Sequence, residues 1–176
     1  HTRLQGDWSS DVCSSDLRAL LEKYPNSQFR NEVMFRVAEN SFSNKKWERA
    51  KSDYRRLLEI ESADNFQDKI IYKMAWIDYI QGKYSKAIEG FVKILDLSSE
   101  FEDKRTLLDT EAQEYLAICF YESSGSKGSA SVIKLRTFAE AHANKPYFRQ
   151  VYLFLGDLLA NNLSFRSAAA AYKGAL

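Results

Sequence analysis

The strongest constraint on this sequence is an internal repeat at a spacing of 37 residues. The segment MFRVAENSFSNKKWERAKSDYRRLLEI, which begins at Met34, aligns with IYKMAWIDYIQGKYSKAIEGFVKILDL, which begins at Ile71. A third copy, VYLFLGDLLANNLSFRSAAAAYKGAL, begins at Val151. Self-similarity at a spacing of this size is typical of proteins that stack one supersecondary unit after another. The repeat therefore predicts a row of similar units.

Each copy of the repeat contains two small residues, the first 12 positions before the second. Apolar residues recur at helical spacing around both of them. Helix axes approach to ~8–10 Å where the side chains between them are small, so the spacing predicts two antiparallel helices joined by a short turn. The small pairs are Ala38 with Ala50, Ala75 with Ala87, and Gly156 with Ala168.

Two aromatic residues flank the second small residue of each copy. The one that stands three positions before it is expected to start the second helix and cover the turn. The one that stands four positions after it is expected to lie on the same helix face and pack inward. These aromatic pairs are Trp47 with Tyr54, Tyr84 with Phe91, and Phe165 with Tyr172.

The pattern predicts an all-α fold. Gly82 is expected to end a helix in the left-handed conformation. The Gly- and Ser-rich stretch SSGSKGSAS at 123–131 predicts a turn longer than the others, followed by a helix that matches the repeat poorly. Helices are expected near 29–43, 47–60, 67–81, 84–97, 105–122, 130–142, 147–161 and 165–176.

This arrangement resembles the tetratricopeptide repeat, whose pattern is W-x2-L-G-x2-Y, then A-x3-F, then P. The best match is Tyr152-x2-Leu155-Gly156, followed by Ala168-x3-Tyr172. The resemblance covers residues 18–176 and implies a right-handed α–α superhelix, a solenoid of antiparallel helix hairpins.

The sequence departs from the tetratricopeptide pattern at two positions. Ser41 and Asp78 stand where the first helix usually has Tyr, and only Pro25 represents the closing proline. By the resemblance, 17–28 is the remnant of a truncated repeat. The repeat domain, 29–176, has about four units and is expected to be truncated at its C-terminal end.

The first 16 residues are expected to be foreign to the protein. A DNA string that resembles a short-read sequencing adapter encodes Asp7 to Asp16 letter for letter, and its preceding bases encode His1 to Arg3. We therefore interpret residues 1–16, with Leu17 as the possible last position, as translated adapter and exclude them from the fold. The natural N-terminus is then expected to be missing, so the sequence does not establish whether a signal peptide precedes it.

Charge and composition disfavour several classes of function. The chain has 25 Lys and Arg against 24 Asp and Glu; leaving out residues 1–16, with one base and three acids, changes the formal charge from +1 to +3. This balance argues against binding to nucleic acid, which needs a basic surface. No apolar run approaches the ~18 residues of a transmembrane helix.

The sequence offers no pattern typical of an enzyme. His142 stands at the end of a predicted helix, where a structural role is favoured. Cys119 lies in the apolar run LAICFY, and outside residues 1–16 the sequence provides no further histidine to pair with it. Metal-ligand spacings and phosphate-binding glycine loops are absent from the sequence. We expect no catalytic residues, no metal and no cofactor.

The resemblance implies that the first helices of successive units line a concave groove that binds extended peptides or partner helices. The groove then contains an aromatic stripe with an acidic rim, and it fits a protein or peptide with apolar anchors and basic charge. The predicted peptide-binding residues are Phe35, Phe42, Tyr72, Trp76, Tyr79 and Tyr121. The predicted rim residues are Glu32, Glu39, Lys69, Glu111, Glu114 and Asp157, and further groove positions are Ile118, Gln150, Leu153 and Ala160.

The function that follows is a protein–protein interaction or assembly scaffold. The alternatives are a regulatory repeat segment of a larger enzyme and a self-associating structural solenoid. The block KMAWIDYIQGKYSKAIEGFVKILD and the junction YPNS are similar to those of bacterial envelope tetratricopeptide proteins. This similarity implies the periplasm or the outer membrane, with the cytoplasm as the alternative.

The repeat alignment predicts that Ala87 is buried where two helices cross. Ala87→Leu should overpack this crossing and lower the free energy of unfolding by about 1–3 kcal/mol. Chemical denaturation of the variant beside the parent chain measures the change. Equal midpoints would show that the repeats are aligned in the wrong register.

Overall fold

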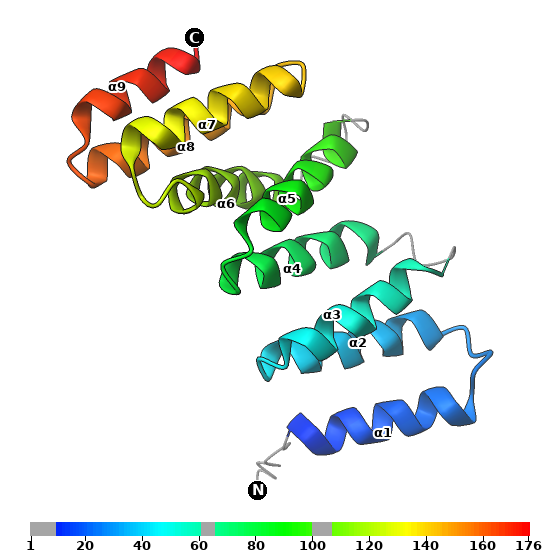
Figure 1. The fold of residues 1–176 in the computed structure, drawn as a ribbon. Coiled ribbons are helices and arrows are strands. Elements are labelled where there is room, and N and C mark those ends of the chain that lie inside the picture. The colour runs from blue at the N-terminus through cyan, green and yellow to red at the C-terminus, as the bar shows by residue number, and fades with distance from the viewer. Residues whose placement is uncertain (1–9, 61–65, 100–106) are drawn as a thin grey trace, which may run out of the picture. The chain divides into compact units, whose positions relative to one another are not determined.

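The computed structural model describes the backbone of residues 10–60, 66–99 and 107–176 and contains only helices and turns in these ranges (Figure 1). The predicted all-α fold is therefore confirmed. The helices are α1 (Ser10–Lys23), α2 (Arg30–Ser43), α3 (Trp47–Leu58), α4 (Gln67–Ile80), α5 (Tyr84–Ser99), α6 (Leu107–Ser123), α7 (Gly128–Ala141), α8 (Phe148–Asn161) and α9 (Phe165–Gly174).

Helices α2 to α9 correspond to the predicted helices, each with ends close to those expected, although residues 105 and 106 lie outside the described residues. Helix α1 corresponds to the expected remnant of a truncated repeat at 17–28, although residues 1–16 were excluded from the fold. Its backbone begins at Ser10, inside the segment that resembles translated adapter. The adapter origin of residues 1–16 stays a prediction from the sequence.

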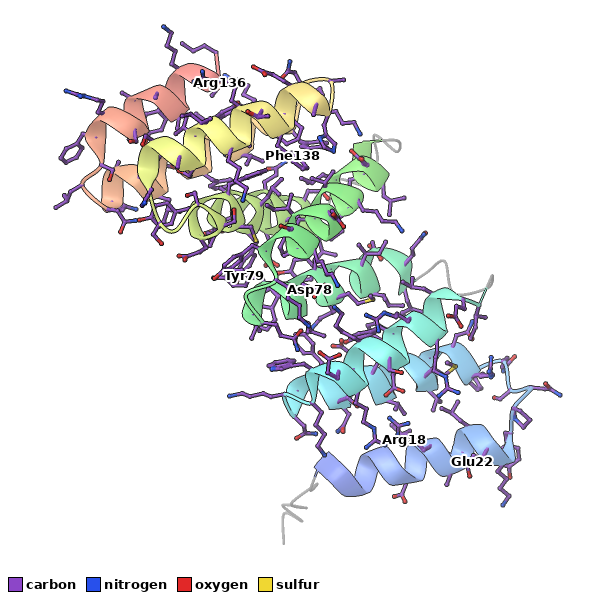
Figure 2. The ribbon with its side chains drawn as sticks, in the orientation of Figure 1. Arg18, Glu22, Asp78, Tyr79, Arg136 and Phe138 are labelled. Carbon is purple, nitrogen blue, oxygen red and sulfur yellow. The ribbon has the colours of Figure 1, made fainter. Side chains whose placement is uncertain are left out.

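The chain forms two compact units, residues 1–70 and 71–176. In the first unit, α2 packs against both α1 and α3. Arg18 of α1 forms an ion pair of 2.6 Å with Asp53 of α3, and Figure 2 shows Arg18 on the side of α1 that faces these helices. The buried side chains of this unit include Val37, Tyr54 and Leu57.

The second unit has a continuous apolar core. First helices α6 and α8 pack against each other, and second helices α7 and α9 do the same. Phe138 of α7 points toward α6 in Figure 2 and lies edge-on to Phe120. The loop before α8 is attached to α5, because Lys145 and Tyr147 both bind the Asp96 carboxylate, at 2.6 and 2.8 Å.

The hairpin turns repeat the same backbone geometry. Lys45, Gly82 and Leu163 occupy equivalent positions, and all three have positive φ, between 57° and 69°. In each turn the next backbone N–H donates to a carbonyl five residues earlier, as from Lys83 to Asp78 at 2.8 Å. This closure is typical of a helix that ends in a left-handed residue, so the prediction for Gly82 is confirmed and the repeat extends to the backbone.

The small residues of the second helices are buried as predicted. Ala50, Ala87 and Ala168 are all within the core. A close approach between α4 and α5, however, lies at Gly90, where an added Cβ would be 2.6 Å from the Cβ of Ala75. Ala75 therefore faces Gly90, which lies three residues beyond its predicted partner Ala87.

The aromatic residues of the second helices pack toward the first helix as predicted. Tyr54 and Phe91 are fully buried, and the ring of Tyr172 lies against Gly156 of α8, although Tyr172 is 37% exposed. Helices α3, α5 and α9 begin at the predicted aromatic residues. Phe165, which was expected to cover the last turn, is 66% exposed because Ala160 stands where the other copies have a ring.

The third hairpin, α6 and α7, corrects another expectation. Its turn comprises only residues 124–127, so helix α7 begins at Gly128, two residues before its expected start. Ser131 and Leu135 are both fully buried, at the positions that Ala87 and Phe91 occupy in α5. The small residues Ala117 and Ser131 are 14 positions apart, two more than in the other copies, and this shift explains why the sequence of this helix matched the repeat poorly.

The close approach at Gly90 gives a second prediction. Gly90→Ala should lower the free energy of unfolding by about 1–3 kcal/mol, because the new methyl group overlaps Ala75 and neither helix backbone can move freely. Gly156→Ala is the control: its methyl group meets the ring of Tyr172, which is part-exposed and can rotate away. Chemical denaturation should show a change below about 1 kcal/mol for this control. Equal destabilisation of both variants would contradict the prediction.

Candidate functional site

The first unit contains a cavity of about 650 Å³ beside α2. Its apolar wall includes Phe35 of α2, which stacks on Phe66 with 4.8 Å between ring centroids and 20° between ring planes. A cavity of this volume is large enough for several side chains of a ligand. The lining residues are Leu17, Glu32, Phe35, Arg36, Glu39, Asn40, Phe66 and Lys69.

The cavity is lined by both acidic and basic groups. Glu32 forms an exposed ion pair of 2.9 Å with Arg36, one turn further along α2. Glu39 accepts a hydrogen bond from the hydroxyl of Tyr54, which is fully buried. Lys69 is exposed at the start of α4. The predicted rim residues Glu32, Glu39 and Lys69 are therefore together at this cavity, beside the predicted Phe35.

The second unit contains a cluster of aromatic rings around Tyr115 of α6. Trp76 lies 6.5 Å from Tyr115 at 82°, and Tyr79 lies 5.2 Å from it at 61°. Phe91 stacks on the same ring at 5.8 Å, and Tyr72 lies edge-on to Phe91 at 6.1 Å. Edge-to-face and offset pairs of this kind stabilise one another. The predicted residues Tyr72, Trp76 and Tyr79 are thus brought together around Tyr115.

Acidic side chains surround this cluster. The hydroxyl of Tyr72 donates a hydrogen bond of 2.7 Å to Glu111. Burial raises the pKa of Tyr72 above its usual range, and the hydrogen bond to Glu111 and the charges of Glu111 and Glu114 raise it further. Burial also raises the pKa of Tyr79, and Cys119, Tyr115 and Glu122 add to the effect. Both hydroxyls therefore stay protonated and can act as hydrogen-bond donors.

Two of the predicted peptide-binding residues close hairpin turns. Phe42 packs edge-on against Trp47 at 5.5 Å, and Tyr79 packs against Tyr84 at 6.2 Å. These two pairs are at equivalent positions, the last turn of a first helix and the first residue of a second helix. Tyr121 has the same position in α6 and is half-buried against the apolar core. Phe42 is not one of the residues that line the cavity, and among the described residues Tyr121 forms no ring pair with Tyr115.

Two of the predicted rim acids bind a tyrosine of their own hairpin. Glu39 accepts from Tyr54, and Asp157 accepts from Tyr172 at 2.7 Å, again at equivalent positions. In the second hairpin, Phe91 has no hydroxyl and the acid is replaced by Trp76. The acid therefore occurs where the second helix presents a hydroxyl, which gives Glu39 and Asp157 a structural role.

The sequence prediction missed Tyr115 and Phe66. Tyr115 connects Trp76, Tyr79 and Phe91, yet it was left out because the resemblance assigns positions 114 and 118 to the groove. The spacing of 111, 115, 118 and 122 along one helix face could have indicated it. Phe66 precedes α4 and follows no repeat position, so no sequence signal was available for it.

Cys119 and His142 have side chains that could act as a nucleophile or a metal ligand. Cys119 is fully buried, and burial raises the pKa of its thiol to about 12, so the reactive thiolate is disfavoured at neutral pH. His142 stacks on Phe138 at 3.9 Å and its Nδ1 lies 2.8 Å from the Phe138 carbonyl oxygen. Within the described ranges, no group of three or more His, Cys, Asp and Glu is placed to hold a metal ion.

Comparison with known proteins gave no match: no protein-family model and no curated protein corresponds to this sequence. In the part of the chain that the structure describes, no helix has the length and apolar character needed to cross a membrane.

The two tyrosine–acid pairs differ in burial, which gives a third prediction. Glu39→Ala leaves the hydroxyl of the buried Tyr54 without its acceptor and should cost about 1–3 kcal/mol of stability. Asp157→Ala, whose partner Tyr172 is part-exposed, should cost less than about 0.5 kcal/mol because water replaces the acceptor. Chemical denaturation of both variants measures the difference. Equal costs would contradict a structural role that depends on burial.

Proposed function

We propose that this chain is a tetratricopeptide-like solenoid whose first helices bind a protein partner through an extended or helical segment. The cavity beside α2 is the observation that carries this proposal. It has an aromatic wall, Phe35 on Phe66, with charged side chains around it. A rigid apolar anchor point inside a polar rim is the usual composition of an interaction hot spot.

The packing of the second unit also supports the tetratricopeptide resemblance. First helices contact first helices, and second helices contact second helices, as α6 with α8 and α7 with α9. In three hairpins the turn has a residue in the left-handed conformation at the same position. Such a scaffold presents equivalent first-helix faces along the chain, which suits recognition of a long ligand.

The partner that fits these surfaces has apolar anchors and basic charge. Phe35 and Trp76 offer rings for apolar contact. Glu32 on α2 and Glu114 on α6 are exposed acids. We place this function in the bacterial periplasm or at the outer membrane. We expect the scaffold to have no catalytic activity. Charge complementarity of this kind favours association and the choice of partner.

Selection of peptides from a random display library tests the proposal. The purified chain should enrich peptides that carry both apolar and basic residues. Phe35→Ala and Trp76→Ala should each weaken the enriched peptides by at least about tenfold, because truncation removes a hot-spot ring. Phe165→Ala is the matched control, since this exposed ring is on the second helix α9.

Thermal melts and sedimentation of all three variants complete the experiment. A first-helix variant that loses binding while it keeps its melting temperature and oligomeric state supports the proposal. Failure to enrich any peptide would contradict it. So would full binding by Phe35→Ala and Trp76→Ala, and a Trp76→Ala chain that unfolds would instead identify Trp76 as a core residue.

A further inference from the structure

Three carboxylates of α6 lie beside the aromatic cluster of the second unit. Glu111 and Glu114 are exposed, and Glu122 is half-buried. Among the residues that the structure describes, none of the three forms an ion pair: Glu111 accepts from Tyr72 at 2.7 Å, and Glu122 accepts from Ser126 at 3.3 Å. The negative charge on this face of α6 is therefore not compensated by an ion pair with a described base.

Two carboxylates elsewhere in the chain, unlike those of α6, do form ion pairs with described bases. Asp53 is paired with Arg18 and Asp96 with Lys145, both at 2.6 Å and both part-buried. These carboxylates hold helices and loops together, so their counter-ions belong to the chain itself. Two of the carboxylates beside the rings instead accept hydrogen bonds from neutral hydroxyl groups, and none of the three forms an ion pair with a described base.

The aromatic rings next to these carboxylates are part-exposed. Tyr72, Trp76 and Tyr115 each keep some surface in contact with solvent. Trp76 and Tyr115 meet at 82°, so the cluster presents ring faces in more than one direction. A ring face carries partial negative charge and attracts a cation placed within ~6 Å of the ring centre. Rings and carboxylates thus attract the same kind of group.

The electrostatics of the two tyrosines agree with this description. Every described charged or polar neighbour that shifts the pKa of Tyr72 raises it, and the same is true of Tyr79. At Tyr152 on α8, by contrast, the nearby Arg136 lowers the pKa against the effect of burial. A base close to Tyr72 or Tyr79 would act in the same direction as Arg136, and no base among the described residues has this effect there.

We propose that Tyr72, Trp76 and Tyr115, together with Glu111 and Glu114, bind an arginine side chain of the partner peptide. This inference rests on the proposed function and specifies the residue that the second unit recognises. A guanidinium group is planar, so it can stack on a ring face while its N–H groups donate to a carboxylate. An ammonium group is a compact charge without this planar match, so lysine is bound less well at such a site.

The experiment uses three fluorescein-labelled, alanine-rich peptides that carry leucine and a test residue on one helix face. The test residue is arginine, lysine or citrulline, which has the shape of arginine without its charge. Fluorescence anisotropy should show that the arginine peptide binds at least about tenfold more tightly than the citrulline peptide, a difference of ~1.4 kcal/mol. The lysine peptide should bind with intermediate affinity.

The matched variants identify the carboxylates that are responsible. The double variant Glu111→Gln with Glu114→Gln should bind the arginine and citrulline peptides almost equally, and its glutamine at 111 still accepts the hydrogen bond from Tyr72. The control, Glu89→Gln with Glu140→Gln, removes the same charge from exposed positions on α5 and α7 and should keep the preference. Thermal melts check that all chains are folded.

The outcomes separate this inference from the proposed function. Equal binding of the arginine and citrulline peptides to the parent chain would overturn the inference and leave peptide binding intact. A preference lost in the control double variant as well would overturn it, because the attraction would then be unspecific. Library peptides that bind while all three test peptides fail would also overturn it. If library peptides fail too, the proposed function itself is contradicted.

Discussion

Each helix hairpin depends on one large side chain of its second helix that packs against the first helix. Tyr54 in α3 and Phe91 in α5 are fully buried, and Leu135 takes this place in α7. In every case a small buried residue stands one turn earlier and allows the two helices to approach. Burial of these side chains supplies the apolar area that a pair of helices needs to stay together.

This packing decides which side chains of the first helices remain available to a ligand. Where the second helix presents a tyrosine hydroxyl, an acid of the first helix is used to accept it, as Glu39 does for Tyr54. The ring near the end of the first helix packs on the start of the second, as Phe42 does on Trp47. What is left is a shorter set than the repeat position alone suggests, centred on Phe35 in the first unit and on Trp76 in the second.

The repeat spacing and the residues at the crossings were sufficient to predict the helices. Ala87 and Gly82 have the predicted burial and backbone conformation, because a small side chain and a left-handed turn are needed at these places in any copy. Both helices of the third hairpin were predicted, but the second of them was not aligned with the repeat, since Ser131 and Leu135 differ chemically from their counterparts and the turn before them is longer. The start of helix α1 at Ser10 was not predicted, because the first residues of this helix carry no apolar periodicity.

The candidate site was less predictable, for a physical reason. A position on a helix face indicates the direction of a side chain and not the partners that it finds there. The roles of Glu39, Asp157 and Phe42 depend on hydroxyls and rings of another helix, and these contacts are visible only in three dimensions. The importance of Tyr115 likewise follows from three ring contacts and not from its place in the repeat.

The central claim is that the first helices form the binding surface. Hydrogen exchange of the chain, measured with and without a saturating basic peptide, tests it most directly. The account predicts slower exchange in α2, α4 and α6 around Phe35, Trp76 and Tyr115, with little change in α3, α5, α7 and α9. Protection confined to the second helices would contradict the claim, because the ligand would then occupy the opposite face of the hairpins.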